Sequence, residues 1–189
     1  MSSHHIVREK QEPALLVLGL DDFSDELLGQ LLEWSPTIIT TQDTAERLNS
    51  RGIKIDWLIS DGNDEVVQSD IKLLDAGDDN LTDAALKFLI LNNYPAVNIV
   101  TDSFKLKEYE FYVDKINMVI FHQHKKIYAI NSKFSKWKPG GESIELLTKA
   151  NNLHFDGLEK ISHDQYITKH DGFFSLAFDG PFLFIAEEI

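Results

Sequence analysis

Two acidic loops carry the residue types in this chain that are best suited to chemistry. The first ends an apolar run and reads Ile55-Asp-Trp-Leu-Ile-Ser-Asp-Gly-Asn-Asp64, and the second reads Asp78-Asp-Asn-Leu-Thr-Asp83. Carboxylates gathered at strand and helix ends are what a hard divalent cation and its phosphate ligand require. The two loops therefore predict a metal–phosphate site, provided that the fold brings them to one edge of a sheet.

A simpler interpretation exists for each acidic residue taken alone. Asp, Asn and Gly are the residues that turns and helix N-caps favour. The functional interpretation gains weight from the pair of loops, because carboxylates on the same edge repel one another unless a cation joins them.

Composition narrows the classes of partner. The formal net charge of −13 argues against a basic surface for nucleic acid or for an anionic membrane. A phosphate-bearing substrate would then need local compensation, which bound Mg²⁺ can supply. The chain has no cysteine, so disulfides, thiolate zinc sites and cysteine nucleophiles are excluded. No Walker-type or Gly-x-Gly-x-x-Gly loop is present, which disfavours ordinary P-loop and dinucleotide sites.

The length of 189 residues suits one large domain or two small ones. The first eleven residues are polar and lack the apolar segment of a signal peptide. No apolar run approaches the roughly 18 residues of a membrane span. We therefore expect a cytoplasmic protein.

The first half of the chain alternates between strand and helix patterns, which predicts a parallel sheet covered on both faces. Ligands of such sheets bind at the carboxyl ends of the strands. Strands are expected at 14–19, 37–41, 57–60, 71–74 and 97–100, and helices at 21–34, at 44–50 and after a cap at Asn80 or Thr82.

The second half loses the helical period. Short apolar runs separated by Gly and Asp turns predict an antiparallel sandwich or barrel. A hairpin is expected at 118–122 and 126–130, with further strands at 143–147, 165–168, 173–178 and 182–186. We expect a helix at 103–115, Trp137 in a loop, and two domains: an α/β domain at 1–118 and a β-sandwich at 119–189.

The acidic loops resemble motifs of the thiamin pyrophosphokinase family, which transfers a pyrophosphoryl group from ATP to thiamin. The family's Gly-Asp-Phe-Asp-Ser is similar to Ser60-Asp-Gly-Asn-Asp64, where Asp61 is kept and Asn63 replaces the second aspartate. Its Asp-Gln-Asp-x-Thr-Asp loop is similar to Asp78-Asp-Asn-Leu-Thr-Asp83, with the outer aspartates and Thr82 kept.

Weaker similarities extend along the chain. Gly19 matches the glycine after the family's first strand, and the aspartate of an Asp-Gly-Gly motif falls on Gln42, or on Asp43 after a one-residue shift. Ser162-His163 stands where the family has a thiamin-contacting Ser-Asn. The family's Gly-Gly-Arg segment has no counterpart between residues 101 and 111.

The resemblance implies an ATP-binding α/β domain, a thiamin-binding β-sandwich and a homodimer with the active site between subunits. It implies that Asp61 and Asp83 act in catalysis and, with Asn63, hold Mg²⁺ against ATP. Gly19, Asp43, Asp78 and Thr82 would contact the nucleotide, and Ser162 and His163 the acceptor.

The substitutions leave three functions open. An amide in place of a ligating carboxylate keeps an oxygen ligand but removes a negative charge, which weakens Mg²⁺ binding. Asp64 and Asp79 add charge nearby. The chain is then an active kinase of this type, a catalytically silent homologue that binds a nucleotide or a thiamin-like ligand, or an enzyme of the same fold with another acceptor.

Overall fold

The computed structural model describes residues 12–60 and 70–189. The chain forms two compact units, Met1–Met118 and Val119–Ile189, which we call the N-terminal and C-terminal units. Asp61, Asn63 and Asp64 lie outside the described residues.

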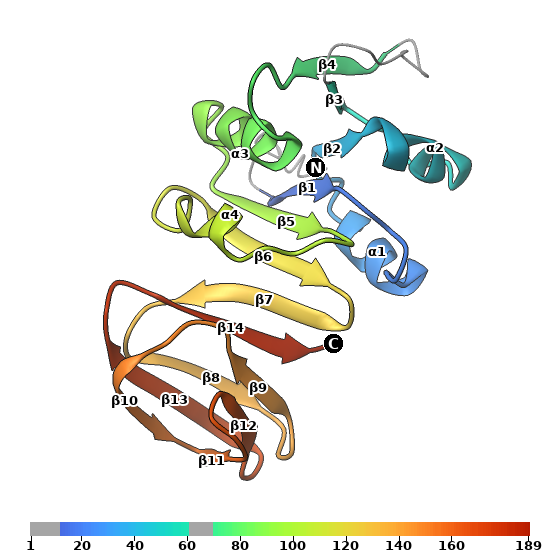
Figure 1. Ribbon diagram of the computed structural model, residues 1–189. Coiled ribbons are helices and arrows are strands. Elements are labelled where there is room, and N and C mark those ends of the chain that lie inside the picture. The colour runs from blue at the N-terminus through green and yellow to red at the C-terminus, as the bar shows by residue number, and fades with distance from the viewer. Residues whose placement is uncertain (1–11, 61–69) are drawn as a thin grey trace, which may run out of the picture. The chain divides into compact units, whose positions relative to one another are not determined.

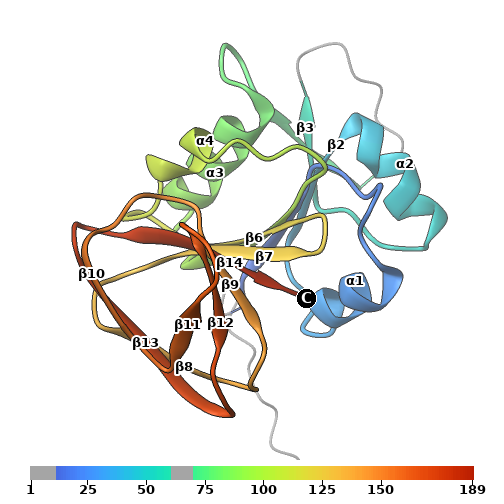
Figure 2. The same ribbon diagram turned by 60° about the horizontal axis from the view of Figure 1, so that its bottom comes forward.

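The N-terminal unit contains a parallel sheet with the strand order β5-β1-β2-β3-β4 (Figure 1). Figure 2 shows α1 and α2 on one face of this sheet and α3 on the other. The alternation of strands and helices agrees with the sequence expectation. The strands are β1 (Ala14–Val17), β2 (Ile38–Thr41), β3 (Trp57–Ser60), β4 (Lys72–Asp75) and β5 (Ala96–Val100), and the helices are α1 (Asp25–Leu32), α2 (Gln42–Ser50), α3 (Leu81–Leu91) and α4 (Lys107–Glu110).

Local sequence explains where these elements begin. All four residues of β1 are buried, as expected of a central strand covered on both faces. Ser24 caps α1 by accepting a hydrogen bond from the backbone N–H of Leu27. Because the strands are parallel, the loops that follow them reach the same edge of the sheet. That edge receives Gly19, the start of α2 and the loop before α3.

The C-terminal unit is antiparallel. One sheet has the order β11-β12-β9-β14-β7-β6, and a separate sheet has the order β10-β13-β8. Both contribute to one core, in which Ile130, Leu146 and Ile185 of the first sheet meet Phe174 and Leu176 of the second. The strands are β6 (Asn117–His122), β7 (Lys125–Ile130), β8 (Phe134–Lys138), β9 (Ser143–Leu146), β10 (Asn151–Asp156), β11 (Leu158–Lys160), β12 (Gln165–Thr168), β13 (Gly172–Asp179) and β14 (Leu183–Glu188).

Two expectations about elements are wrong. The helix expected over 103–115 is reduced to α4, one turn long. Trp137 lies in strand β8 and not in a loop; it pairs with Phe173 of β13, and both rings are exposed. Strands β8, β10 and β11 had no counterpart in the sequence expectation. β8 and β11 lack an apolar alternation, and β10 has only the short one of Leu153 and Phe155.

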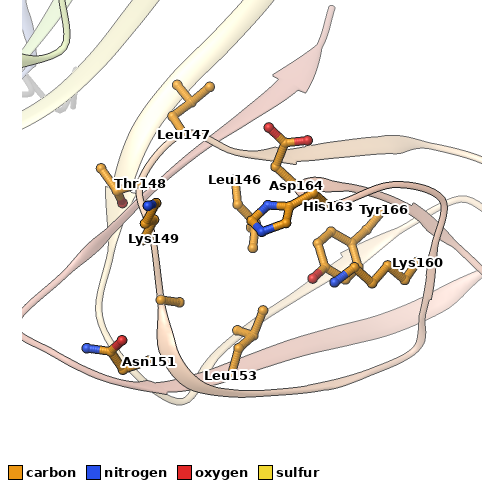
Figure 3. Close-up of a pocket in the computed structure, with 11 residues that line it drawn as sticks. Leu146, Leu147, Thr148, Lys149, Asn151, Leu153, Lys160, His163, Asp164 and Tyr166 are labelled. Atoms are coloured by element: carbon orange, nitrogen blue, oxygen red, sulfur yellow. The ribbon is translucent and has the colours of Figure 1, made fainter.

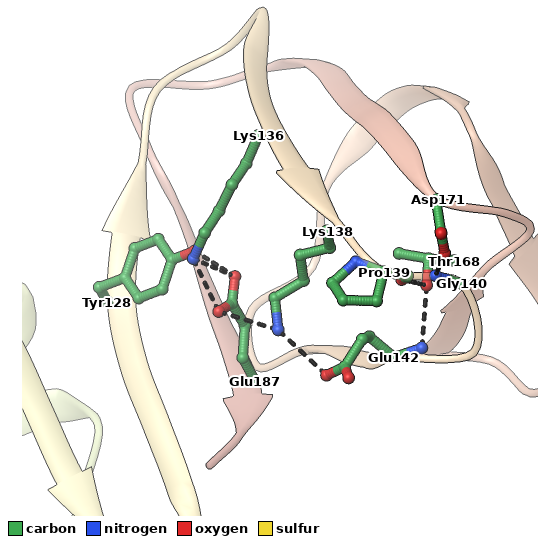
Figure 4. Close-up of polar contacts among 9 residues, drawn as sticks. All are labelled: Tyr128, Lys136, Lys138, Pro139, Gly140, Glu142, Thr168, Asp171 and Glu187. Carbon is green, nitrogen blue, oxygen red and sulfur yellow. Dashed lines mark hydrogen bonds and ion pairs between the residues drawn. The ribbon is translucent and has the colours of Figure 1, made fainter.

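The inward face of β8 is charged because it surrounds a buried carboxylate (Figure 4). Glu187 is 4% exposed and accepts hydrogen bonds from Lys136, at 2.7 and 2.8 Å, and from the Tyr128 hydroxyl. The Lys138 ammonium lies 3.3 Å from the same carboxylate and also pairs with Glu142. A buried charge is tolerated only when it is paired and hydrogen-bonded in this way.

Candidate functional site

The N-terminus of α3 presents Asp83 at the carboxyl edge of the parallel sheet. Asn80 caps this helix: its side-chain oxygen accepts from the Asp83 backbone N–H at 2.9 Å, and its Nδ2 donates to Asp83 Oδ2 at 2.8 Å. The cap agrees with one of the two sequence alternatives. It also gives Asn80 a clear structural role and fixes the Asp83 side chain on one side.

Tyr112 fixes Asp83 on the other side. Its hydroxyl donates to Asp83 Oδ1 at 2.7 Å. Burial, the hydrogen bond to Asp83 and the charges of Asp83 and Asp79 all raise the pKa of Tyr112. Tyr112 is therefore a protonated donor at neutral pH. Sequence reasoning missed this residue, and the only signal was the aromatic character of the segment after β5.

A shallow cleft of about 420 Å³ opens beside Asp83. Lys87 and Lys107 line it together with Asp83, Glu108 and the two rings of Phe111 and Tyr112. Lys87 pairs with Asp79, whereas Lys107 has no hydrogen bond or ion pair within the part of the chain that is described. A cleft that holds both a carboxylate and lysines is suited to a metal-bound phosphate chain. The carboxylate can bind the metal ion, and the lysines can bind the phosphate oxygens.

Thr82 is buried in the first turn of α3. It is 9% exposed, and it hydrogen-bonds to the side chain of Tyr109, whose pKa is raised chiefly by burial. Thr82 is therefore placed to support the first turn of α3. Asp78 is exposed in the loop that precedes α3.

Gly19 lies at the end of β1 against the loop that follows β5. A Cβ at this position would collide with the carboxylate of Asp102 and stand 2.8 Å from its backbone N, so only glycine fits. Oδ1 of Asp102 accepts from the Asp21 backbone N–H at 2.9 Å, and Arg47 of α2 pairs with the Asp21 carboxylate. The sequence did not indicate Asp102, Asp21 or Arg47, which together join the loops after β1 and β5 to helix α2.

Gln42 and Asp43 occupy the first two positions of α2. Asp43 is exposed, whereas Gln42 is half-buried. Either can therefore be presented at the carboxyl edge, and the choice between them stays a prediction.

The donor set at this edge fits Mg²⁺ in kind. Residues 12–60 and 70–189 contain no group of three or more His, Asp or Glu side chains placed to hold a metal ion. Mg²⁺ does not require such a cage, because it keeps several waters and binds through one or two carboxylates plus substrate phosphates. Asp83 is the described residue best placed for that role, and Asp61 and Asn63 lie outside the described residues.

Ser162 and His163 are both exposed in the connection between β11 and β12. The Ser162 hydroxyl donates to Asp164 Oδ1 at 3.3 Å. His163 lines a cavity of about 550 Å³ in the C-terminal unit (Figure 3).

No protein-family model matches the chain, and no curated protein matches its sequence. Solved structures do match it. Thiamin pyrophosphokinase from Geobacillus thermodenitrificans has a TM-score of 0.71 at 8% identity, over 93% of this chain and 97% of that chain. The Bacillus subtilis enzyme has a TM-score of 0.68 at 12% identity, over 94% and 99% of the two chains. Thiamin pyrophosphokinase from Candida albicans has a TM-score of 0.68 at 11% identity, over 94% and 90%.

The fold is that of the thiamin pyrophosphokinases. The similarity in fold extends over nearly the whole chain. At identities of 8 to 12%, the structural match establishes the fold alone, and the activity has to be argued from the site. Among the described residues, no helix is both long and apolar enough to cross a membrane.

Proposed function

We propose that this protein transfers a pyrophosphoryl group from ATP to thiamin or a thiamin-like alcohol, giving AMP and the diphosphate ester. The observation that carries the proposal is the placement of Asp83. Asp83 matches a motif aspartate of the family and lies at the carboxyl edge of the parallel sheet, in a chain with the thiamin pyrophosphokinase fold. Asn80 and Tyr112 hold its side chain beside a cleft that lysines line.

The reaction forms one bond and breaks one. The acceptor hydroxyl oxygen attacks the β-phosphorus of ATP, the bond to the oxygen bridging the α- and β-phosphates breaks, and AMP leaves with that oxygen. The hydroxyl proton passes to solvent or to a nearby base. Such transfers need positioning and charge neutralisation more than covalent help from the protein.

The residues divide this work. Asp83, with Asp61 and Asn63, would hold Mg²⁺, which supplies charge neutralisation at the phosphates when bound. Gly19, Asp78 and Asp43 or Gln42 would contact the nucleotide, and Thr82 would support the loop. Lys107 faces the cleft with its ammonium available for a phosphate oxygen. Tyr112 orients Asp83 by its hydrogen bond.

The remaining parts of the proposal follow the family pattern. Residues 1–118 would bind the nucleotide, and residues 119–189 the acceptor, with Ser162 and His163 as contacts. We propose a homodimer that acts in the cytoplasm.

A second candidate is a silent homologue that binds a nucleotide or a thiamin-like ligand without turnover. Its support is the loss of carboxylates at Gln42 and Asn63, since each amide removes one charge from a Mg²⁺ site. The third candidate is an enzyme of the same fold that uses another acceptor alcohol.

Turnover separates these candidates. The purified protein is incubated with ATP, Mg²⁺ and thiamin, and AMP and thiamin diphosphate are quantified by chromatography. We expect both products in equal amounts, and none when the metal is chelated. Product no higher than in the chelated control, at high protein concentration and long incubation, would rule out the kinase.

Two aspartate variants localise the activity. Asp83→Asn removes a charge at the proposed metal site and should lower the rate about 10- to 100-fold. Asp114→Asn changes an exposed aspartate of the same unit and should leave the rate unchanged. Equal rates for the two variants would remove Asp83 from the mechanism.

A further inference from the structure

Three lysines of the C-terminal unit lie near the buried carboxylate of Glu187. Lys136 and Lys138 of β8 pair with this carboxylate, and with the Tyr128 hydroxyl they occupy both of its oxygens (Figure 4). The third lysine is Lys126 of β7. It pairs in register with Glu187 of β14, so the two side chains leave the sheet on the same face.

Lys126 differs from the other two lysines because it has no polar partner of its own. Within residues 12–60 and 70–189, its amine forms no hydrogen bond or ion pair. On the side away from Glu187, its neighbour in register is Phe121 of β6, which is 7% exposed. Lys126 is therefore flanked by a buried ring on one side and, on the other, by a carboxylate whose oxygens are already engaged.

These surroundings disfavour the charged form of Lys126. Burial and the charge of Lys136 lower its pKa below the ordinary lysine value, Lys138 adds to this effect, and the Glu187 carboxylate offsets only part of it. The uncharged amine is therefore more abundant at neutral pH than it is for a lysine in water. Only the uncharged amine is a nucleophile, and desolvation and neighbouring cations are the two conditions that activate a lysine.

The cluster is also open to a reagent and carries excess positive charge. Lys126 is half-buried, so a small molecule can reach its amine. The three lysines face only two carboxylates, those of Glu142 and Glu187. The excess charge attracts an anionic reagent. Conversion of the Lys126 amine into an amide would remove this excess and leave two lysines paired with two carboxylates.

We propose that Lys126 is a site of covalent acylation by small acyl phosphates. The amine nitrogen attacks the carbonyl carbon of the reagent, and a bond forms between them. The bond from that carbon to the bridging oxygen breaks, phosphate leaves with the oxygen, and the amine proton passes to solvent. A neutral amide then replaces the ammonium. The inference goes beyond the proposed function, because it concerns the C-terminal unit alone and requires neither ATP, metal nor acceptor.

The test compares the lysines of one sample. The full-length wild-type protein is incubated with acetyl phosphate at neutral pH, without metal or nucleotide, and peptide mass spectrometry gives the rate of acetylation at each lysine. We expect Lys126 to react about tenfold faster than the exposed Lys133 and Lys169. Lys125 is the matched control, because it is half-buried like Lys126 but pairs with Glu145, and it should react no faster than the exposed lysines.

Two further measurements separate activation by the fold from simple access. In denaturing urea, Lys126, Lys125 and Lys133 should react at similar rates, because the fold creates the difference between them. In the folded protein, the rate at Lys126 should level off at a lower pH than the rate at Lys133, as expected of an amine that loses its proton more readily.

Matched variants assign the reactivity to the cluster. Glu187→Gln removes the carboxylate that favours the Lys126 ammonium, so it should raise the rate at Lys126 about two- to fivefold. Glu188→Gln changes the exposed neighbour and should leave that rate unchanged. Because the wild-type comparison decides the inference alone, the result does not depend on the stability of the Glu187→Gln variant.

Two outcomes would overturn the inference: a rate at Lys126 in the folded wild type that is equal to or below that at Lys125 and Lys133, or a preference for Lys126 that persists in urea. The proposed function has its own test. If Lys126 is acetylated as expected while ATP and thiamin give no product, the inference stands and the proposed kinase activity fails.

Discussion

Single residues at the carboxyl edge are held more tightly than their sequence context suggests. Asp83 is positioned by the Asn80 amide and the Tyr112 hydroxyl, which engage its two oxygens separately. The sequence predicted Asp83 and the cap at Asn80 because both follow local rules. Tyr112 could not be predicted in this way, since it reaches Asp83 across 29 positions and only the tertiary fold brings the two together.

Gly19 gives the clearest prediction at this scale. Gly19→Ala would place a methyl group against both the carboxylate and the backbone N of Asp102. Because backbone must move to relieve the contact, we expect the free energy of unfolding to fall by about 1–3 kcal/mol in urea titrations.

Gly29→Ala is the matched control. Gly29 lies inside α1, and a Cβ there would meet nothing within 4 Å. Alanine is a better helix former than glycine, so this variant should be as stable as the wild type or up to about 1 kcal/mol more stable. Equal stability of the two alanine variants would show that Gly19 is not required by close approach.

Among the elements, those with an apolar signature were predictable and those with a charged inner face were not. Strand β3 was predicted residue for residue, because Trp57-Leu-Ile-Ser60 is a short apolar run. Strand β8 was missed because its inward positions after Phe134 are Lys136 and Lys138, which read as solvent-facing. Their burial depends on Glu187, which comes from a strand near the end of the chain.

The Glu187 network joins β7, β8 and β14, and it should make the stability of the C-terminal unit depend on pH. Burial acts to raise the pKa of Glu187, but hydrogen bonds from Lys136 and Tyr128 and the two lysine charges lower it below the ordinary glutamate value. A carboxylate with a lowered folded-state pKa contributes stability above its unfolded-state pKa. That contribution is lost as the pH falls through the folded-state pKa.

Glu187→Gln should therefore lower the free energy of unfolding by about 2–3 kcal/mol at pH 7. The difference from the wild type should shrink as the pH falls below the ordinary glutamate range. Urea titrations at a series of pH values measure this, with Glu188→Gln as the control because Glu188 is the exposed neighbour. A difference that stays constant down to low pH would mean that the charge of Glu187 is not the stabilising feature.

At the scale of the whole molecule, the order of the two architectures was readable from the sequence. The sequence pattern changes from alternating strands and helices to short strands with tight turns. The arrangement of strands and the fold shared with thiamin pyrophosphokinases agree with this change. The candidate site was only partly readable. The acidic motifs predicted the aspartates. The surrounding Arg47, Asp102 and Tyr112 come from three separate loops or helices and belong to no motif.

The net charge of −13 sets a requirement for the nucleotide site. A nucleotide at the carboxyl edge needs a metal ion, because carboxylates dominate there. Chelation should therefore abolish nucleotide binding.

The central claim is that the carboxyl edge of the N-terminal unit binds a metal–nucleotide at Asp83. A crystal structure with Mg²⁺ and α,β-methylene-ATP, in which the bond cleaved in pyrophosphoryl transfer is blocked, tests it most directly. We predict phosphates at this edge and a metal ion bound by Asp83 at about 2.0–2.1 Å or through one water. A nucleotide bound elsewhere, or bound with Asp83 still joined only to Asn80 and Tyr112, would contradict the account.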